Sequence, residues 1–279
     1  MNKKRMSLNK PIWKLRNWID LNKINYLNLS ENKKAIDFLL ENKLLINWFG
    51  ISLNPNAIEI IEKNLDKISW KLLSFNKNAI RILEKNEEKI DWSNLSLNKN
   101  AIKLLEKNEG KINWSNLCKN KNAIEILKRN PNKIEWFYLS SNANAIELLM
   151  DNMDKIVFNQ FSLNTNIKAI DYLINNPEKI HWYNFTTNHK AMDYINKNKN
   201  KIYWINLSLN KNGLELLEKN QKKIDWYNLS YNPSIFELDY KKMKKNNEEM
   251  EEELIKEIMK PERVFKNFDY DYIEILFGD

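Results

Sequence analysis

Apolar and polar positions along this chain repeat with a period of 22 residues. An aromatic residue marks each period, and Tyr26 occupies the same slot one period before Trp48. The spacing from Phe158 to Trp182 is two residues longer than the period. The aromatic anchors are Trp48, Trp70, Trp92, Trp114, Trp136, Phe158, Trp182, Trp204 and Trp226. A fixed period of this length is typical of solenoids, whose units cannot bury an apolar face alone and must stack on their neighbours.

Each period predicts two helices. An apolar residue three positions after the anchor, such as Leu95 after Trp92, places both side chains on one face of a short helix. The residue before the anchor is often Asn, Ser or Asp, which favour a helix N-cap. An Ala-Ile-x-Leu-Leu segment, as at 101–105, then forms the broad apolar stripe of a second helix. We therefore expect a helix of about five or six residues and one of about ten in every unit.

Two columns of asparagine separate these helices. The first lies six residues after each anchor, and proline follows it at Asn54 and Asn232, which indicates the N-cap and first turn of the second helix. The second column, for example Asn108, ends that helix, and asparagine tolerates the left-handed conformation that closes a helix. We interpret both columns as caps, with a ladder that reads a ligand as the alternative.

The aromatic column also has two interpretations. Exposed aromatics at regular spacing can stack on the bases of single-stranded nucleic acid. Each anchor, however, has apolar neighbours two residues before and three after it, and Phe158 and Tyr26 replace tryptophan as core residues would. We therefore interpret the nine anchors as structural core positions.

The period sets the predicted domain organisation. Residues 1–22, with Trp13 and Trp18, resemble an N-terminal capping helix, and residues 23–238 form the helical repeat array. Residues 239–279 combine a basic block, an acidic run and apolar positions, which predicts a C-terminal helical cap or a docking tail. The expected fold is all-α, a solenoid of about nine to ten repeats with helical terminal caps.

Composition supports helices and an intracellular setting. Four glycines and six prolines in 279 residues are too few for a turn-rich β architecture. Neither a transmembrane segment nor a signal peptide is apparent, so we expect an intracellular protein with no membrane partner. The single cysteine, Cys118, fits a reducing compartment. The net charge of +8 is uneven, because 241–279 carries −3 and 1–240 carries +11.

No catalytic constellation is visible in the sequence. His181 and His189 occupy slots that hold polar residues in other units, and Cys118 occupies a slot of serine and threonine. Metal-ligand spacing, a phosphate-binding glycine loop and a dinucleotide fingerprint are all missing. We expect no enzymatic activity, no metal, no cofactor and no small-molecule substrate.

The repeat consensus supports a resemblance. It reads Asn-Pro/Lys-Asn-Ala-Ile-x-Leu-Leu-Glu-Lys-Asn-x-x-Lys-Ile-x-Trp-x-x-Leu-Ser-x-Asn across roughly 20–235. This resembles the short tandem-repeat proteins of large nucleocytoplasmic DNA viruses, which are often labelled ankyrin-like. The resemblance implies a giant-virus origin and a place in the host cytoplasm or the virion. The period is shorter than the ankyrin repeat of about 33 residues, and the architecture is similar to leucine-rich-variant repeats.

A scaffold for protein–protein interaction is the leading functional hypothesis. The slots one and two residues after each anchor vary most, and their aromatics suggest partner contacts at Phe137, Tyr138, Tyr183 and Tyr227. One alternative is a solenoid that binds nucleic acid through its basic surface, although a charged slot on the second helix alternates in sign between units. Another is a structural virion or assembly component. The protein partner itself is not identified by the sequence.

Overall fold

The computed structural model describes residues 11–42 and 46–260. The chain is an all-α repeat solenoid, as the period predicts, and the described residues contain one two-stranded sheet. We number positions in a repeat from its anchor, position 0, so that repeat 1 begins at Tyr26 and repeat 10 at Trp226. A short helix starts at every anchor: α1 (Tyr26–Glu31), α3 (Trp48–Leu53), α5 (Trp70–Leu73), α7 (Trp92–Leu97), α9 (Trp114–Lys119), α11 (Trp136–Leu139), α13 (Phe158–Phe161), α15 (Trp182–Phe185), α17 (Trp204–Leu209) and α19 (Trp226–Tyr231).

A second helix follows in each of the first nine repeats. These outer helices are α2 (Ile36–Glu41), α4 (Ile58–Glu62), α6 (Ile80–Glu84), α8 (Ile102–Glu106), α10 (Ile124–Arg129), α12 (Ile146–Met150), α14 (Ile167–Asn175), α16 (Met192–Lys197) and α18 (Leu214–Lys219). Short 3-10 helices are η1 (Leu21–Lys23), η3 (Glu87–Lys89), η4 (Glu109–Lys111), η5 (Pro131–Lys133), η6 (Ala143–Ala145), η7 (Met153–Lys155), η8 (Pro177–Lys179), η9 (Lys199–Lys201), η10 (Gln221–Lys223) and η11 (Pro233–Ile235).

The predicted cap before the anchor is confirmed in most repeats. In repeat 4, Asp91 Oδ1 accepts a hydrogen bond from Asn94 N at 2.8 Å and so satisfies a free donor of the first turn. The second helix is shorter than the predicted ten residues, because the chain leaves the α-helix at Lys107 and turns through η4. The two residues inserted in repeat 7 lie at α14, the longest of the outer helices.

The left-handed conformation predicted for the second asparagine column is wrong. Asn108 has φ −132° and ψ 45°, which is not left-handed. Its Nδ2 instead donates to the carbonyl of Leu104 at 3.0 Å. An amide side chain that reaches back by four residues satisfies an open carbonyl of the last helical turn, so the helix ends without a positive φ.

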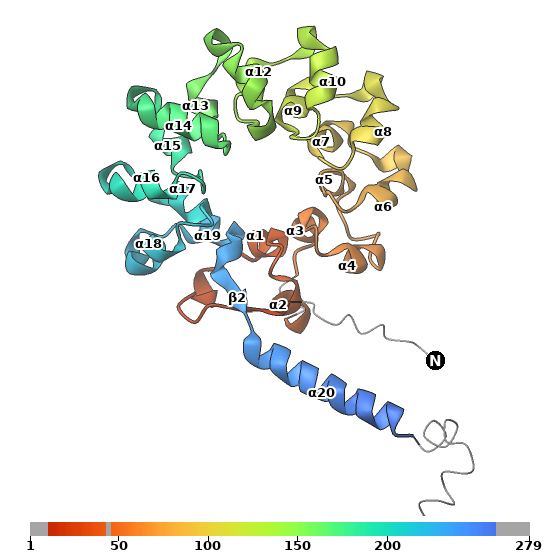
Figure 1. Ribbon diagram of the computed structural model, residues 1–279. Helices are drawn as coiled ribbons and strands as arrows, with labels where there is room; N and C mark the ends of the chain where they lie inside the picture. The colour runs from red at the N-terminus through yellow and green to blue at the C-terminus, as the bar shows by residue number, and fades with distance from the viewer. Residues whose placement is uncertain (1–10, 43–45, 261–279) are drawn as a thin grey trace, which may run out of the picture. The chain divides into compact units, whose positions relative to one another are not determined.

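The repeats close into a ring within the unit Leu15–Glu237. Figure 1 shows short helices such as α5, α7 and α17 on the inner side and their partners α6, α8 and α18 on the outer side, with α1 beside both α3 and α19. Across this junction, which we call the seam, Asn25 N donates to Ser230 Oγ at 2.9 Å, and Asn28 Nδ2 donates to the carbonyl of Tyr227 at 2.9 Å. Repeat 1 therefore stacks on repeat 10 as any repeat stacks on the one before it.

The first asparagine column forms a ladder that runs around the whole ring. In repeat 4, Asn98 Nδ2 donates to the carbonyls of Ser74 at 3.0 Å and Asn76 at 2.9 Å, both in repeat 3, and its Oδ1 accepts from Asn100 N. The column therefore caps the following turn and also joins neighbouring repeats. Every position-6 asparagine donates to the position-4 carbonyl of the preceding repeat: Asn32, Asn54, Asn76, Asn98, Asn120, Asn142, Asn164, Asn188, Asn210 and Asn232. These side chains are buried, and such pairing offsets the cost of burying an amide.

The core lies between the two layers of helices. In repeat 4 it contains Leu95, Ala101 and Leu105, each fully buried, together with the hydroxyl of Ser96. That hydroxyl donates to the carbonyl of Trp92 and accepts from Asn113 N of the next repeat. Apolar burial and repeated polar bonds thus act at the same junctions.

The aromatic anchors are half-buried rather than enclosed by the core. In repeat 4, the Lys111 ammonium lies 4.4 Å from the centroid of the Trp92 ring, and the Lys89 ammonium covers Trp70 in the same way at 4.6 Å. The anchor therefore packs one side against the core and presents the other to a cation. The contact also crosses the seam, where Lys23 lies 5.2 Å from the Trp226 ring.

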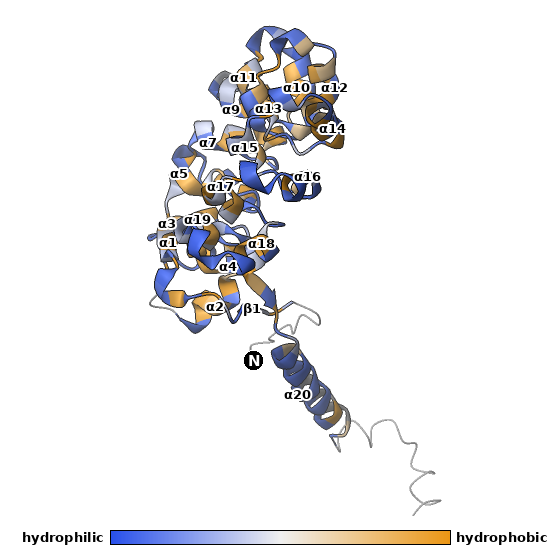
Figure 2. Ribbon diagram, turned by 90° about the vertical axis from the view of Figure 1, so that its left-hand side faces the viewer, coloured by the Kyte–Doolittle hydropathy of each residue, from blue (hydrophilic) through white to orange (hydrophobic). Residues whose placement is uncertain are grey.

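The ends of the described chain lie outside the repeats. Residues 13–15 form a strand, β1 (Trp13–Leu15), which pairs with β2 (Phe236–Leu238), so the predicted N-terminal capping helix is wrong for this segment. The chain divides into the unit Leu15–Glu237 and a second unit of Met1–Lys14 with Leu238–Asp279. The second unit contains α20 (Tyr240–Ile258), which Figure 2 shows as mostly hydrophilic. The apolar tail predicted to dock, from residue 264 onward, lies outside the described residues.

Candidate interaction surfaces

Positions 1 and 5 of the short helices form the exposed inner surface of the ring. Positions 3 and 4, such as Leu95 and Ser96, are buried between the short helix and the outer helix. Because residues four apart share one side of a helix, positions 1 and 5 lie on the opposite side, and they face the interior of the ring seen in Figure 1. The column that alternates in charge, at position 11, belongs to the outer helices and has no bearing on this surface.

A row of exposed apolar side chains crosses the seam at position 1. We call it the apolar row: Tyr183, Ile205, Tyr227, Leu27 and Phe49, from repeats 8, 9, 10, 1 and 2. Their exposed fractions run from 37% at Leu27 to 62% at Phe49. Tyr203 extends the row, with its ring centroid 5.4 Å from that of Tyr183, and Tyr231 lies 6.0 Å from Tyr227. Five consecutive repeats thus present apolar groups to solvent, which marks interaction sites on protein surfaces.

Of the four residues that the sequence predicts as partner contacts, two belong to the apolar row and two do not. Tyr183 and Tyr227 belong to the apolar row, with Ile205 between them. Phe137 is 45% exposed but stands apart, because Asn159 occupies position 1 of the intervening repeat. Tyr138 is half-buried, packs edge-on against Phe137 at 5.2 Å and lies under the Lys119 ammonium at 4.3 Å.

Leu27 and Phe49 are members of the row that sequence reasoning did not select. Both lie at position 1, so the variable column identified their slot. Their adjacency to Tyr227 depends on ring closure, for which the sequence carries no direct signal.

A pocket rich in lysine lies on a different arc of the ring. Residues of repeats 2–5, mostly at positions 5 and 7, line a pocket of about 300 Å³. Four of the lining residues are lysines, and we call the apolar lining residues its apolar floor. The floor includes Leu53, Phe75 and Leu97. We call the cations the basic strip: Lys77, Lys99, Lys119 and Lys121.

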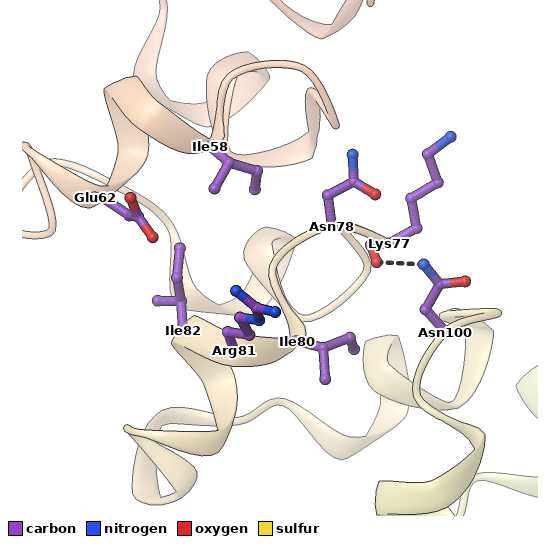
Figure 3. Close-up of a pocket in the computed structure, with 8 residues that line it drawn as sticks. All are labelled: Ile58, Glu62, Lys77, Asn78, Ile80, Arg81, Ile82 and Asn100. Atoms are coloured by element: carbon purple, nitrogen blue, oxygen red, sulfur yellow. Dashed lines mark hydrogen bonds between the residues drawn. The ribbon is translucent and has the colours of Figure 1, made fainter. Parts of the chain in front are cut away.

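The basic strip contains charges that no described carboxylate neutralises. Three lysines on the outer helices pair with glutamate: Lys128 with Glu125 at 3.0 Å, Lys168 with Glu147 at 2.7 Å and Lys219 with Glu215 at 2.6 Å. None of the four strip lysines forms an ion pair with a described residue, and positions 5–8 of repeats 2–5 contain no acidic side chain. Lys77 also lines a second pocket together with Glu62, and Figure 3 shows its side chain pointing away from that carboxylate.

Backbone pairing fixes the spacing of the strip. In repeats 2–7 and 9, the position-8 asparagine donates to the position-7 carbonyl of the preceding repeat. Asn100 Nδ2 donates to the carbonyl of Lys77 at 2.8 Å, drawn in Figure 3, and Asn122 Nδ2 donates to that of Lys99 at 2.9 Å. The lysine-bearing turns are therefore held in line, one per repeat.

Neighbouring lysines contribute to a lowered pKa at two position-7 side chains. Partial burial, followed by repulsion from Lys99 and Lys33, lowers the pKa of Lys77. Burial and three neighbouring lysines also lower the pKa of His189 at position 7 of repeat 8. Beside the seam, burial raises the pKa of Glu31 to about 7, and burial together with the Glu31 carboxylate raises that of Tyr231.

Comparison with known proteins gives no further guide. No family model, curated protein or solved structure matches this chain. The interpretation of its surfaces therefore depends on their chemistry alone.

Other candidate groups have structural roles. Cys118 is buried, its Sγ accepts from Glu135 N at 3.3 Å as the serines of its column do, and burial raises its pKa. His181 Nδ1 caps α15 by accepting from Asn184 N. Within 11–42 and 46–260, no cluster of three metal-ligating side chains occurs, and no helix is long and apolar enough to cross a bilayer.

Proposed function

We propose that this protein is a non-enzymatic scaffold that binds a protein partner along the apolar row. The observation that supports this proposal is the continuity of exposed apolar groups at position 1 over five consecutive repeats, three of them aromatic (Tyr183, Tyr227 and Phe49). Tyrosine contributes large contact area with little loss of side-chain freedom, which makes it a frequent interface anchor.

The framework suits this role because it is rigid. The hydrogen-bonded ladder fixes the spacing between repeats, so binding does not have to order the row. The row contains no charged side chain, which favours an uncharged, apolar segment of a partner protein over a polyanion.

Site-specific crosslinking tests the proposal. A photoreactive phenylalanine analogue replaces Tyr227 in one variant and Ile167, a 65% exposed residue of α14 outside the row, in a matched control. Proteins crosslinked from position 227 and not from position 167 are then re-examined with Tyr183→Ala/Tyr227→Ala. We expect this double substitution to weaken capture of those partners by about 1,000-fold, since two anchor residues at about 2 kcal/mol each contribute about 4 kcal/mol. Equal capture by the two crosslinker positions contradicts the proposal.

A further inference from the structure

We propose a second binding site, independent of the apolar row: the basic strip and its apolar floor bind single-stranded nucleic acid. The strip lies in repeats 3–5, whereas the row lies in repeats 8–10, 1 and 2, so each can be altered without touching the other. The first argument is charge. Four lysines line one pocket with no described carboxylate partner, whereas Lys128 and Lys219 on the outer helices pair with glutamates.

The second argument is the linear arrangement of the strip. Lys77, Lys99 and Lys121 occupy the same position in successive repeats, and position-8 asparagines hold their turns in register. Packed helices lie about 8–10 Å apart, so the ammonium groups follow one another at about that interval. A polymer with regularly spaced anionic groups matches this array, and helical-repeat proteins that read RNA take one base per repeat.

The third argument separates nucleic acid from an acidic protein segment. Phe75 lines the same pocket as the lysines and is 45% exposed, and Leu53 and Leu97 occupy its position in the repeats before and after it. A nucleobase can stack on such a ring while lysines contact its phosphates, which is the general pattern of single-strand binding. A run of carboxylates uses the lysines alone and leaves the apolar floor without a partner.

The charge environment of Lys77 is consistent with an anionic ligand. Partial burial, and then repulsion from Lys99 and Lys33, lowers the pKa of Lys77, and an anionic ligand would relieve that repulsion. The position-8 asparagine side chains bond only to the backbone carbonyls of Lys77, Lys99 and Lys121, so these bonds do not engage the ammonium groups.

The salt dependence of binding tests this inference. Fluorescein-labelled 20-nucleotide oligo(U) and oligo(dT) are titrated with the full chain at 50 and 200 mM salt, and fluorescence anisotropy is measured. Four phosphate contacts predict a slope of log K against log [salt] of about −2.8, or a loss of about 50-fold between these conditions. Lys77→Gln/Lys99→Gln/Lys121→Gln should reduce the slope to about −0.7 and the loss to about threefold.

A matched variant removes the same charge elsewhere. Lys63, Lys85 and Lys107 occupy one exposed position at the ends of α4, α6 and α8. Lys63→Gln/Lys85→Gln/Lys107→Gln should retain the slope of the unaltered chain. Phe75→Ala, which leaves the charge unchanged, should weaken binding at least fivefold, the lower end of a base-stacking contribution. Circular dichroism and thermal unfolding verify that each variant is folded.

Three outcomes overturn the inference. The first is the absence of binding to either oligonucleotide at 20 mM salt. The second is an equal loss of oligonucleotide affinity in both triple variants, which indicates that binding depends on net charge alone. The third is displacement of the oligonucleotide by 20-residue poly-L-glutamate at equal charge concentration, which assigns the strip to an acidic protein segment. Tyr183→Ala/Tyr227→Ala should leave oligonucleotide binding unchanged. A failure of this inference can therefore be distinguished from a failure of the proposed partner binding at the apolar row.

Discussion

Because the ring is closed, removing the position-6 asparagine of repeat 1 should lower the free energy of unfolding of the protein as much as removing that of an interior repeat. Asn32 Nδ2 donates across the seam to the carbonyls of Ser230 at 3.3 Å and Asn232 at 3.0 Å, and its Oδ1 accepts from Lys34 N. Asn98 makes the equivalent three bonds within the array. At about 0.5–1.5 kcal/mol for each bond, Asn32→Ala and Asn98→Ala should each cost about 2–4 kcal/mol.

An open array gives a different result. There Asn32 has no preceding repeat, so only its bond with Lys34 N is lost, at about 0.5–1.5 kcal/mol. Urea unfolding followed by circular dichroism measures both variants, and unchanged m-values keep their midpoints comparable. A cost for Asn32→Ala near one third of that for Asn98→Ala would refute closure. Small-angle scattering adds a direct check, because an opened seam increases the radius of gyration.

Three further predictions concern single positions. Gly50→Ala should destabilise the protein by about 1–3 kcal/mol, because an added Cβ would lie 2.4 Å from the Leu27 carbonyl oxygen, whereas Gly110→Ala, with no atom within 4 Å, should cost nothing in the same thermal unfolding measurement. Burial raises the folded-state pKa of Glu31 to about 7, so its stabilising contribution is complete below about pH 4.5 and is lost as the pH rises to about 7. Glu31→Gln should remove this pH dependence between pH 4.5 and 7.5, and an unchanged profile would assign it to other groups. Cys118→Ser should retain or increase stability, since the serine at this position in repeat 4 both donates and accepts a bond whereas Cys118 Sγ accepts one, while Cys118→Ala should lower the urea midpoint.

The sequence was sufficient to predict the helices because the same local signals recur in successive repeats. The aromatic anchor, the cap before it at Asp91 and the Ala-Ile-x-Leu-Leu stripe are all local signals, and the structure has them where they were expected. The role of the position-6 asparagine was only partly predictable. Its capping bond is local, but the two bonds of Asn98 Nδ2 join residues in another repeat.

Ring closure could not be predicted because it depends on a small rotation summed over all the repeats. That rotation arises from side-chain packing at every junction, including the close approach of α1 and α3 at Gly50, and has no signature in one period. Of the two proposed surfaces, only the apolar row depends on closure. The apolar row becomes continuous only when Tyr227 and Leu27 are neighbours. The basic strip forms within adjacent repeats, where position 7 lies beside position 5.

Closure also constrains how this chain can evolve. Repeat arrays ordinarily grow and shrink by tandem duplication or deletion of whole units, and an open solenoid accepts either change at little cost. In a closed ring, an eleventh unit requires every junction to change its angle, or it breaks the bonds between repeat 1 and repeat 10. Selection should therefore keep the unit number constant while tolerating short insertions inside a repeat, such as the two residues at α14, which leave the ladder continuous at Asn164 and Asn188.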